Sequence, residues 1–103
     1  MTDILNDVEI FCRKLFLKHN IQMFQQSLNR DGATYLGECF SLRGEHFLIS
    51  IVVKRNEILV RVINVTGLGK TCVFQKAYTV LNNKNTFSKS VSLDNFLTKT
   101  LYS

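Results

Sequence analysis

The segment that comes nearest to a catalytic motif is Gly67-Leu68-Gly69-Lys70-Thr71. Its Gly-Lys-Thr ending is shared with phosphate-binding loops, in which backbone amides wrap a phosphate while the lysine and threonine contact phosphate and magnesium. Such a loop has a glycine five residues before Gly69, where this chain has Asn64, and a helix follows it, whereas the residues after Thr71 favour a strand. We therefore predict a flexible turn between two strands here and no nucleotide site.

A second group that could do chemistry is Cys39, Ser41 and His46. A two-residue hairpin loop at Arg43-Gly44 would place all three on one face of a sheet. A nucleophile needs its base within hydrogen-bond reach and a third group that orients the base. Diagonal neighbours on two strands lie about 7–8 Å apart, and the pattern puts no acidic residue beside the imidazole. We expect a structural cysteine near a surface histidine, and no enzymatic activity.

Metal and paired-carboxylate chemistry also lack support. The cysteines and histidines show no C-x-x-C or H-x-x-x-H spacing of the kind that prepares a zinc site; they are Cys12, Cys39, Cys72, His19 and His46. The glutamates fall one to a hairpin, at Glu38, Glu45 and Glu57, so no two-carboxylate hydrolase is indicated. We expect no metal and no cofactor. An odd number of distant cysteines predicts buried thiols in a reducing compartment.

The elements that would position these side chains follow from the spacing of apolar residues. Within residues 1–18 they recur at steps of three and four, which predicts an amphipathic helix with Asn20 at its end. They are Ile4, Leu5, Val8, Phe11, Cys12, Leu15 and Phe16. Further on, Leu93, Phe96, Leu97 and Leu101 share one face of a short C-terminal helix, for which Ser92 is the predicted N-cap.

Between these helices the pattern changes to strands at about 21–28, 33–42, 46–54, 57–65 and 72–80, although the last segment also fits a helix. Turns are predicted at residues 29–32, 43–44 and 55–56, and such short connections require antiparallel neighbours. Two-residue loops would set Phe40 opposite Phe47, and Ile51 opposite Val60. Glu38 would then lie on the apolar face, unless a bulge at Gly37 rotates it outward. The predicted fold is α+β, with an N-terminal amphipathic helix on a four- to five-stranded antiparallel sheet and a short C-terminal helix.

The other face of these strands is also rich in apolar residues, namely Leu48, Val52, Leu59 and Ile63. A sheet face that meets water usually carries polar residues. We therefore expect the face to be covered, either by the C-terminal helix, by a second copy in a homodimer, or by a binding partner.

Charge is distributed unevenly along the chain. The net charge is +5, and no acidic residue occurs between Glu57 and Asp94. We expect a basic contact surface made of Lys54, Arg55, Arg61, Lys70 and Lys76. Such a surface attracts acidic proteins or nucleic acid.

The sequence therefore favours a small non-enzymatic protein-binding or regulatory module, for example an inhibitor that occludes a larger protein partner. The alternative is a nucleic-acid-binding accessory protein that uses a basic sheet or loop face. With 103 residues the chain fits one α+β domain, 1–103. The acidic start and the lack of a long apolar run predict no membrane contact and a cytoplasmic location. Abundant Asn, Lys and Phe without Pro or Trp are typical of AT-rich genomes, such as those of phages.

Overall fold

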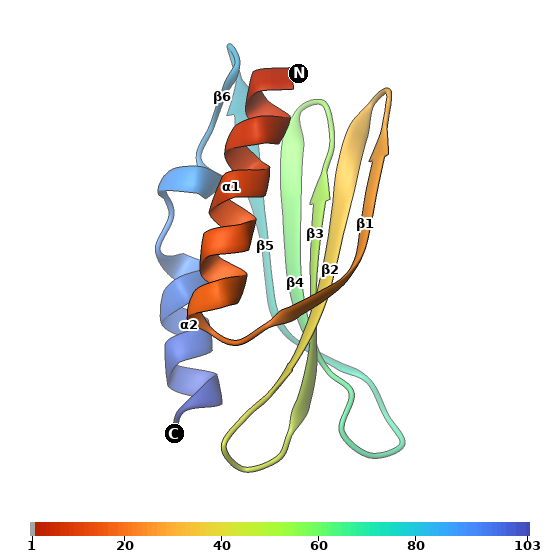
Figure 1. The fold of residues 1–103 in the computed structure, drawn as a ribbon, viewed down its shortest axis with the longest axis vertical. Coiled ribbons are helices and arrows are strands. Elements are labelled where there is room, and N and C mark those ends of the chain that lie inside the picture. Colours follow the sequence, from red (N-terminus) through yellow and green to blue (C-terminus); the bar gives the residue numbers. More distant parts are fainter. Residues whose placement is uncertain (1) are drawn as a thin grey trace.

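Two helices lie on the same face of a curled antiparallel sheet in the computed structural model, which describes residues 2–103 (Figure 1). The helices are α1 (Thr2–Lys18) and α2 (Ser92–Leu101), with a short 3₁₀ helix, η1 (Phe87–Lys89), before α2. The strands are β1 (Gln22–Asn29), β2 (Gly32–Phe40), β3 (His46–Val53), β4 (Glu57–Asn64), β5 (Thr71–Leu81) and β6 (Lys84–Asn85), and they are neighbours in chain order. The predicted α+β fold is confirmed, but the sheet has six strands instead of four or five.

The first helix is confirmed, together with its end. Val8, Cys12 and Phe16 are buried against the sheet. Asn20 has a left-handed backbone conformation, with φ at 56°, and the Ile21 amide donates a 2.8 Å hydrogen bond to the Phe16 carbonyl. This closure satisfies a carbonyl in the last helical turn and directs the chain into β1.

The predicted two-residue turn at Arg43-Gly44 is wrong, and the pairing of β2 with β3 is shifted by one residue from the prediction. The strands are joined by residues 41–45, and the turn is closed by a 2.9 Å hydrogen bond from the Ser41 amide to the Glu45 carbonyl. Cys39 therefore pairs with Phe47, and Phe40 pairs with His46. A shift of one residue moves every side chain of β2 to the other face.

This register gives Gly37 a role other than the predicted bulge. Gly37 faces the helices, where an added Cβ would lie 2.6 Å from Ile21 Cγ2 and 2.9 Å from Phe16 Cε2. Glu38 falls on the opposite face without any bulge. The irregularity in this part of the sheet is in β1, between Met23 and Gln25.

The remaining strands follow the prediction closely. The β3–β4 pairing sets Ile51 opposite Val60, as expected, and residues 71–81 form a strand instead of a helix. The polar run at residues 82–85 predicts a solvated loop, but the chain makes a tight turn there. Asn82 and Asn83 have φ values of 53° and 59°, as in the hairpin turn that asparagine favours, and this turn adds β6.

The C-terminal helix is confirmed, but its predicted cap is wrong. Ser92 lies in the helix and its amide donates to the Ser90 hydroxyl at 3.1 Å. Leu93, Leu97 and Leu101 are buried in the same apolar cluster as α1. No helix in residues 2–103 is long and apolar enough to cross a membrane.

Candidate interaction face

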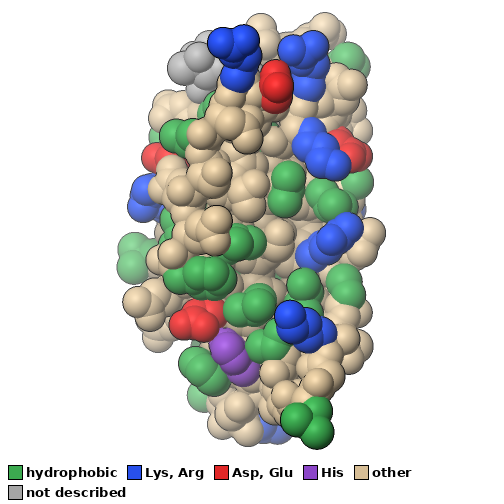
Figure 2. Space-filling model, turned by 90° about the vertical axis from the view of Figure 1, so that its right-hand side faces the viewer, with side chains coloured by type: hydrophobic (Ala, Val, Ile, Leu, Met, Phe, Trp, Pro, Cys, Tyr) green, Lys and Arg blue, Asp and Glu red, His purple; other side chains and the backbone are tan. Residues whose placement is uncertain are grey.

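The side of the sheet that faces away from α1 and α2, here called the outer face, is the surface that the sequence left unassigned. Because α2 packs with α1 on the other side, it does not cover the outer face (Figure 1). Figure 2 shows this side of the molecule, with hydrophobic side chains spread across it and basic side chains mainly at its upper end and along its right-hand side. The structure therefore excludes the C-terminal helix as the cover of this face, and leaves a second copy or a binding partner.

The four apolar residues predicted for this face form two cross-strand pairs. Val52 lies opposite Leu59, and Leu48 lies opposite Ile63. Between these pairs Ser50 lies directly opposite Arg61. All four aliphatic residues are half-buried. Arg61 is thus bracketed by apolar surface above and below.

Arg61 is exposed, and in the part of the chain that the structure describes its guanidinium makes no ion pair. It lines a shallow depression of about 270 Å³ together with Ile63, Lys70, Cys72 and Gln75. The structure thus brings one of the predicted basic residues, Lys70, close to Arg61, and both lie beside the apolar pairs.

The other predicted basic residues lie elsewhere. Lys54 and Arg55 are at the β3–β4 turn, where Lys54 Nζ is 3.9 Å from Glu57 Oε1 and Arg55 is 3.8 Å from an Asp31 carboxylate oxygen. Lys76 is on the helix side of β5, and its ammonium donates to the Ser92 hydroxyl at 3.0 Å. The five basic residues are therefore divided among the outer face, one end of the sheet and the α2 side.

A histidine and a glutamate meet at the other end of the outer face. His46 Nε2 lies 3.0 Å from Glu38 Oε2, and the imidazole stacks on Phe40 with a centroid distance of 4.5 Å and an interplanar angle of 13°. The sequence interpretation missed this contact because it put Glu38 on the buried side. Ala33, Tyr35 and Cys39 occupy alternate positions of β2 and are all buried. That alternation puts Glu38 on the outer face, and it could have predicted the contact with His46.

The predicted group of Cys39, Ser41 and His46 is not assembled. Cys39 is buried on the helix side of the sheet, where burial raises the pKa of its thiol to about 11, and His46 is on the outer face. The Ser41 hydroxyl accepts a 3.1 Å hydrogen bond from the Glu45 amide. The three groups thus have separate structural settings, and Cys39 remains a protonated thiol at neutral pH.

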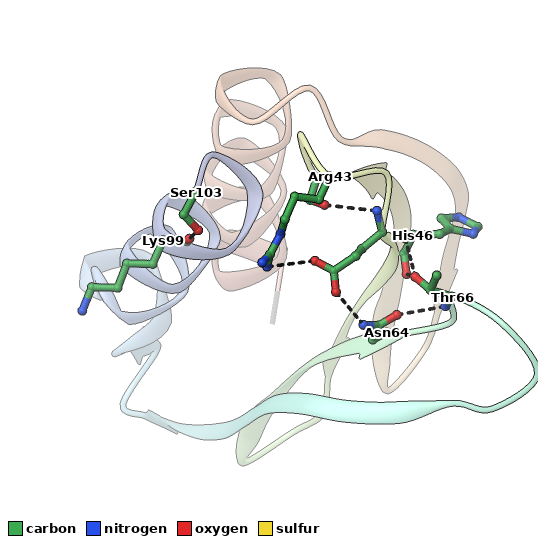
Figure 3. Close-up of polar contacts among 8 residues, drawn as sticks. Arg43, His46, Asn64, Thr66, Lys99 and Ser103 are labelled. Atoms are coloured by element: carbon green, nitrogen blue, oxygen red, sulfur yellow. Dashed lines mark hydrogen bonds and ion pairs between the residues drawn. The ribbon is translucent and has the colours of Figure 1, made fainter.

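The loops at this end are joined by a polar network (Figure 3). The Glu45 carboxylate accepts a 3.1 Å hydrogen bond from the Arg43 guanidinium and a 3.4 Å hydrogen bond from the side-chain amide of Asn64. The Thr66 hydroxyl accepts from the His46 amide at 2.7 Å, and the Thr66 amide donates to Asn64 Oδ1. These bonds hold the β2–β3 loop against the start of the glycine-rich turn.

The glycine-rich segment itself connects two antiparallel strands, because β4 ends at Asn64 and β5 begins at Thr71. No helix follows it, and this agrees with the predicted turn. No family model, curated protein or solved structure matches the chain. Among residues 4–103, whose side chains the structure describes, no three side chains of His, Cys, Asp or Glu gather as a metal site would require.

Proposed function

We propose that this protein is a small, non-enzymatic protein-binding module that regulates or inhibits a larger partner by occluding part of its surface. The observation that supports the proposal is the arrangement around Arg61. Two aliphatic cross-strand pairs bracket an exposed guanidinium on a sheet face that both helices leave open.

This arrangement has the composition of a binding centre. Interface hot spots are enriched in arginine, and surrounding apolar contacts that exclude water strengthen them. A partner carboxylate would form a charge-assisted hydrogen bond with Arg61, while apolar groups beside that carboxylate would pack on Leu48, Val52, Leu59 and Ile63. The expected partner surface is therefore acidic at its centre and apolar around it.

The experiment is an affinity pull-down of the tagged protein from source-cell lysate, with and without nuclease, comparing the wild-type with Arg61→Glu and Lys76→Glu. The two variants make the same charge change on opposite sides of the sheet. We expect a stoichiometric protein that survives nuclease treatment, is lost with Arg61→Glu and is kept with Lys76→Glu. Undiminished capture by Arg61→Glu would contradict the proposal.

A second candidate is single-stranded nucleic acid binding on the same face. It is favoured by the pairing of Arg61 with Lys70 in one depression, and by the exposed ring of Phe40, which could stack on a base. In the same experiment this function predicts nucleic acid in the bound fraction, and protein partners that disappear after nuclease digestion.

We further propose that the protein works in a reducing, intracellular compartment, because Cys12, Cys39 and Cys72 are all free thiols. The composition also fits an origin in a phage or mobile element. Recovery of the protein with blocked or disulfide-linked cysteines from its source would contradict the reducing setting.

A further inference from the structure

A cavity lies at the end of the sheet where the β1–β2, β3–β4 and β5–β6 turns come together beside the start of α1 (Figure 1). Its volume is about 400 Å³, and pockets that hold small molecules measure about 300–1,000 Å³. The residues that line it come from these three turns, from the end of β5 and from the first turn of α1. None of them contributes to the proposed function.

The sheet topology brings the three turns to one end. In a meander of six antiparallel strands, the connections after β1, β3 and β5 all fall at the same end of the sheet. The Val80 amide donates a 3.0 Å hydrogen bond to the Asn56 carbonyl, which fixes the β3–β4 turn against β5. The Asp31 amide donates to the Asn29 side chain at 2.9 Å, which shapes the β1–β2 turn. The walls of the cavity are therefore held by the backbone of three hairpins.

Two arginines from different turns line the cavity. They are Arg30 in the β1–β2 turn and Arg55 in the β3–β4 turn. In the described part of the chain the Arg30 guanidinium makes no ion pair, and the ion pair of Arg55 is its 3.8 Å approach to Asp31. A pair between two exposed side chains contributes little, so both guanidiniums are available to an anion. Asp31 is the one acidic residue among those that line the cavity.

The rest of the lining is partly apolar and partly amide. Ile4 and Val80 are buried, so they form the inner wall, and Leu81 adds exposed apolar surface. Asn82 and Asn83 also line the cavity, and an asparagine amide both donates and accepts hydrogen bonds. A ring with apolar faces and polar edges matches this combination, and a phosphate matches the two arginines.

We propose that this cavity binds a nucleoside monophosphate. A guanidinium binds phosphate through two parallel hydrogen bonds, and two guanidiniums offset the charge of a phosphate monoester, which is about −1.5 to −2 at pH 7. The base packs on the aliphatic wall while the asparagines hydrogen-bond its edge. The Asp31 carboxylate accepts hydrogen bonds from the ribose hydroxyls, a role that a bare phosphate does not use.

Amide NMR spectra of the full chain, titrated with AMP, CMP, GMP and UMP, test the proposal. At least one nucleotide should bind with a dissociation constant on the order of 0.1–1 mM and shift the amides of residues 30–31, 55–56 and 80–83. Its nucleoside, ribose 5-phosphate and inorganic phosphate should each bind about tenfold more weakly or less, since each makes only part of the contacts. Equal binding of any of these three would overturn the assignment of a nucleotide.

A 5′-phosphorylated tetranucleotide distinguishes a free nucleotide from the end of a nucleic acid. It should bind at the cavity no more tightly than the corresponding monomer, because the cavity has the volume of a small-molecule site. Tighter binding of the tetranucleotide, measured at the same amides, would overturn the small-molecule ligand.

Substitutions at the turns test the arginines. Arg30→Gln and Arg55→Gln change exposed residues and should each weaken nucleotide binding by about fivefold or more. The matched control is Arg43→Gln, which removes an exposed arginine from the β2–β3 loop at the opposite end of the sheet and should leave the affinity unchanged. The proposal is overturned if no nucleotide shifts the turn amides at about 10 mM. It is also overturned if the two turn variants bind as the wild-type does, or if all three variants lose affinity equally.

Discussion

The Nε2 atom of His19 lies 2.6 Å from Oδ1 of Asp94, which connects the end of α1 to the first turn of α2. The His19 side chain is buried, and its Nδ1 atom lies 3.3 Å from the Tyr102 hydroxyl. Lys18 donates to the other carboxylate oxygen of Asp94 at 2.8 Å. This contact attaches the C-terminal helix to a residue 75 positions earlier in the chain.

Asp94→Ala should lower the free energy of unfolding by about 1–3 kcal/mol, because it leaves a buried imidazole nitrogen without its partner. Urea denaturation followed by circular dichroism measures the change. Lys18→Ala is the matched control. It removes only the exposed member of the cluster and should cost less than about 1 kcal/mol. Equal losses of unfolding free energy in the two variants would show that the contact with the buried His19 does not determine the stability lost in Asp94→Ala.

The same carboxylate predicts how stability changes in acid. Hydrogen bonds from Lys18, and then from His19, hold the pKa of Asp94 below its ordinary value of 3.8. A carboxyl with a lowered folded-state pKa contributes stability above the unfolded value and loses it as the pH falls through the folded value. The difference in unfolding free energy between wild-type and Asp94→Ala should thus be full above about pH 5 and narrow toward pH 2. A difference that stays constant over this range would contradict the assignment.

The three thiols should react at very different rates with an aromatic disulfide reagent at pH 8. Burial raises the pKa of Cys12 to about 12 and that of Cys39 to about 11, whereas Cys72 is exposed. The expectation from sequence that all three would be buried is therefore wrong for Cys72. One equivalent should react fast and two only on unfolding, since the thiolate is the reactive form. Cys72→Ser should abolish the fast phase, and a surviving fast phase would contradict this assignment.

Two adjacent residues of β3 should lose very different amounts of stability on the same substitution. Leu48→Asp places a carboxylate on the half-buried outer face and should cost about 1 kcal/mol while the protein stays folded. Ile49 is 0% exposed, so Ile49→Asp buries an unpaired charge and should cost more than about 4 kcal/mol. Urea titrations of both variants check the difference. Unfolding of Leu48→Asp would mean that the outer face belongs to the internal core.

Local spacing was sufficient to predict the helices and most of the strands. The three- and four-residue steps from Ile4 to Phe16 define the buried stripe of α1, and Asn20 tolerates the left-handed conformation that ends it. The two-residue turn at Arg55-Asn56 fixed the pairing of Ile51 with Val60, because a turn that short allows one register. The same argument failed between β2 and β3, where a five-residue loop around Gly44 replaced the expected tight turn.

The residues of the outer face could be predicted from the sequence, but its exposure could not. Alternation along β3 and β4 placed Leu48, Val52, Leu59 and Ile63 together, and that grouping holds in the structure. Both faces of these strands are apolar, however, so alternation alone could not say which face the helices would cover. Aromatic contacts on one side, such as the rings of Phe74 and Phe96 at 5.0 Å, determine that choice, and they join β5 to α2.

The sequence by itself thus determined the two helices, most of the strands, the α+β class and the absence of the familiar catalytic spacings, because each depends on residues close together in the chain. Only the tertiary structure decided which sheet face stays open, that Lys76 and Arg61 lie on opposite sides, and that Asp94 meets His19. These relations join segments far apart in the chain. They depend on how the whole core packs, and spacing within one segment carries no information about that.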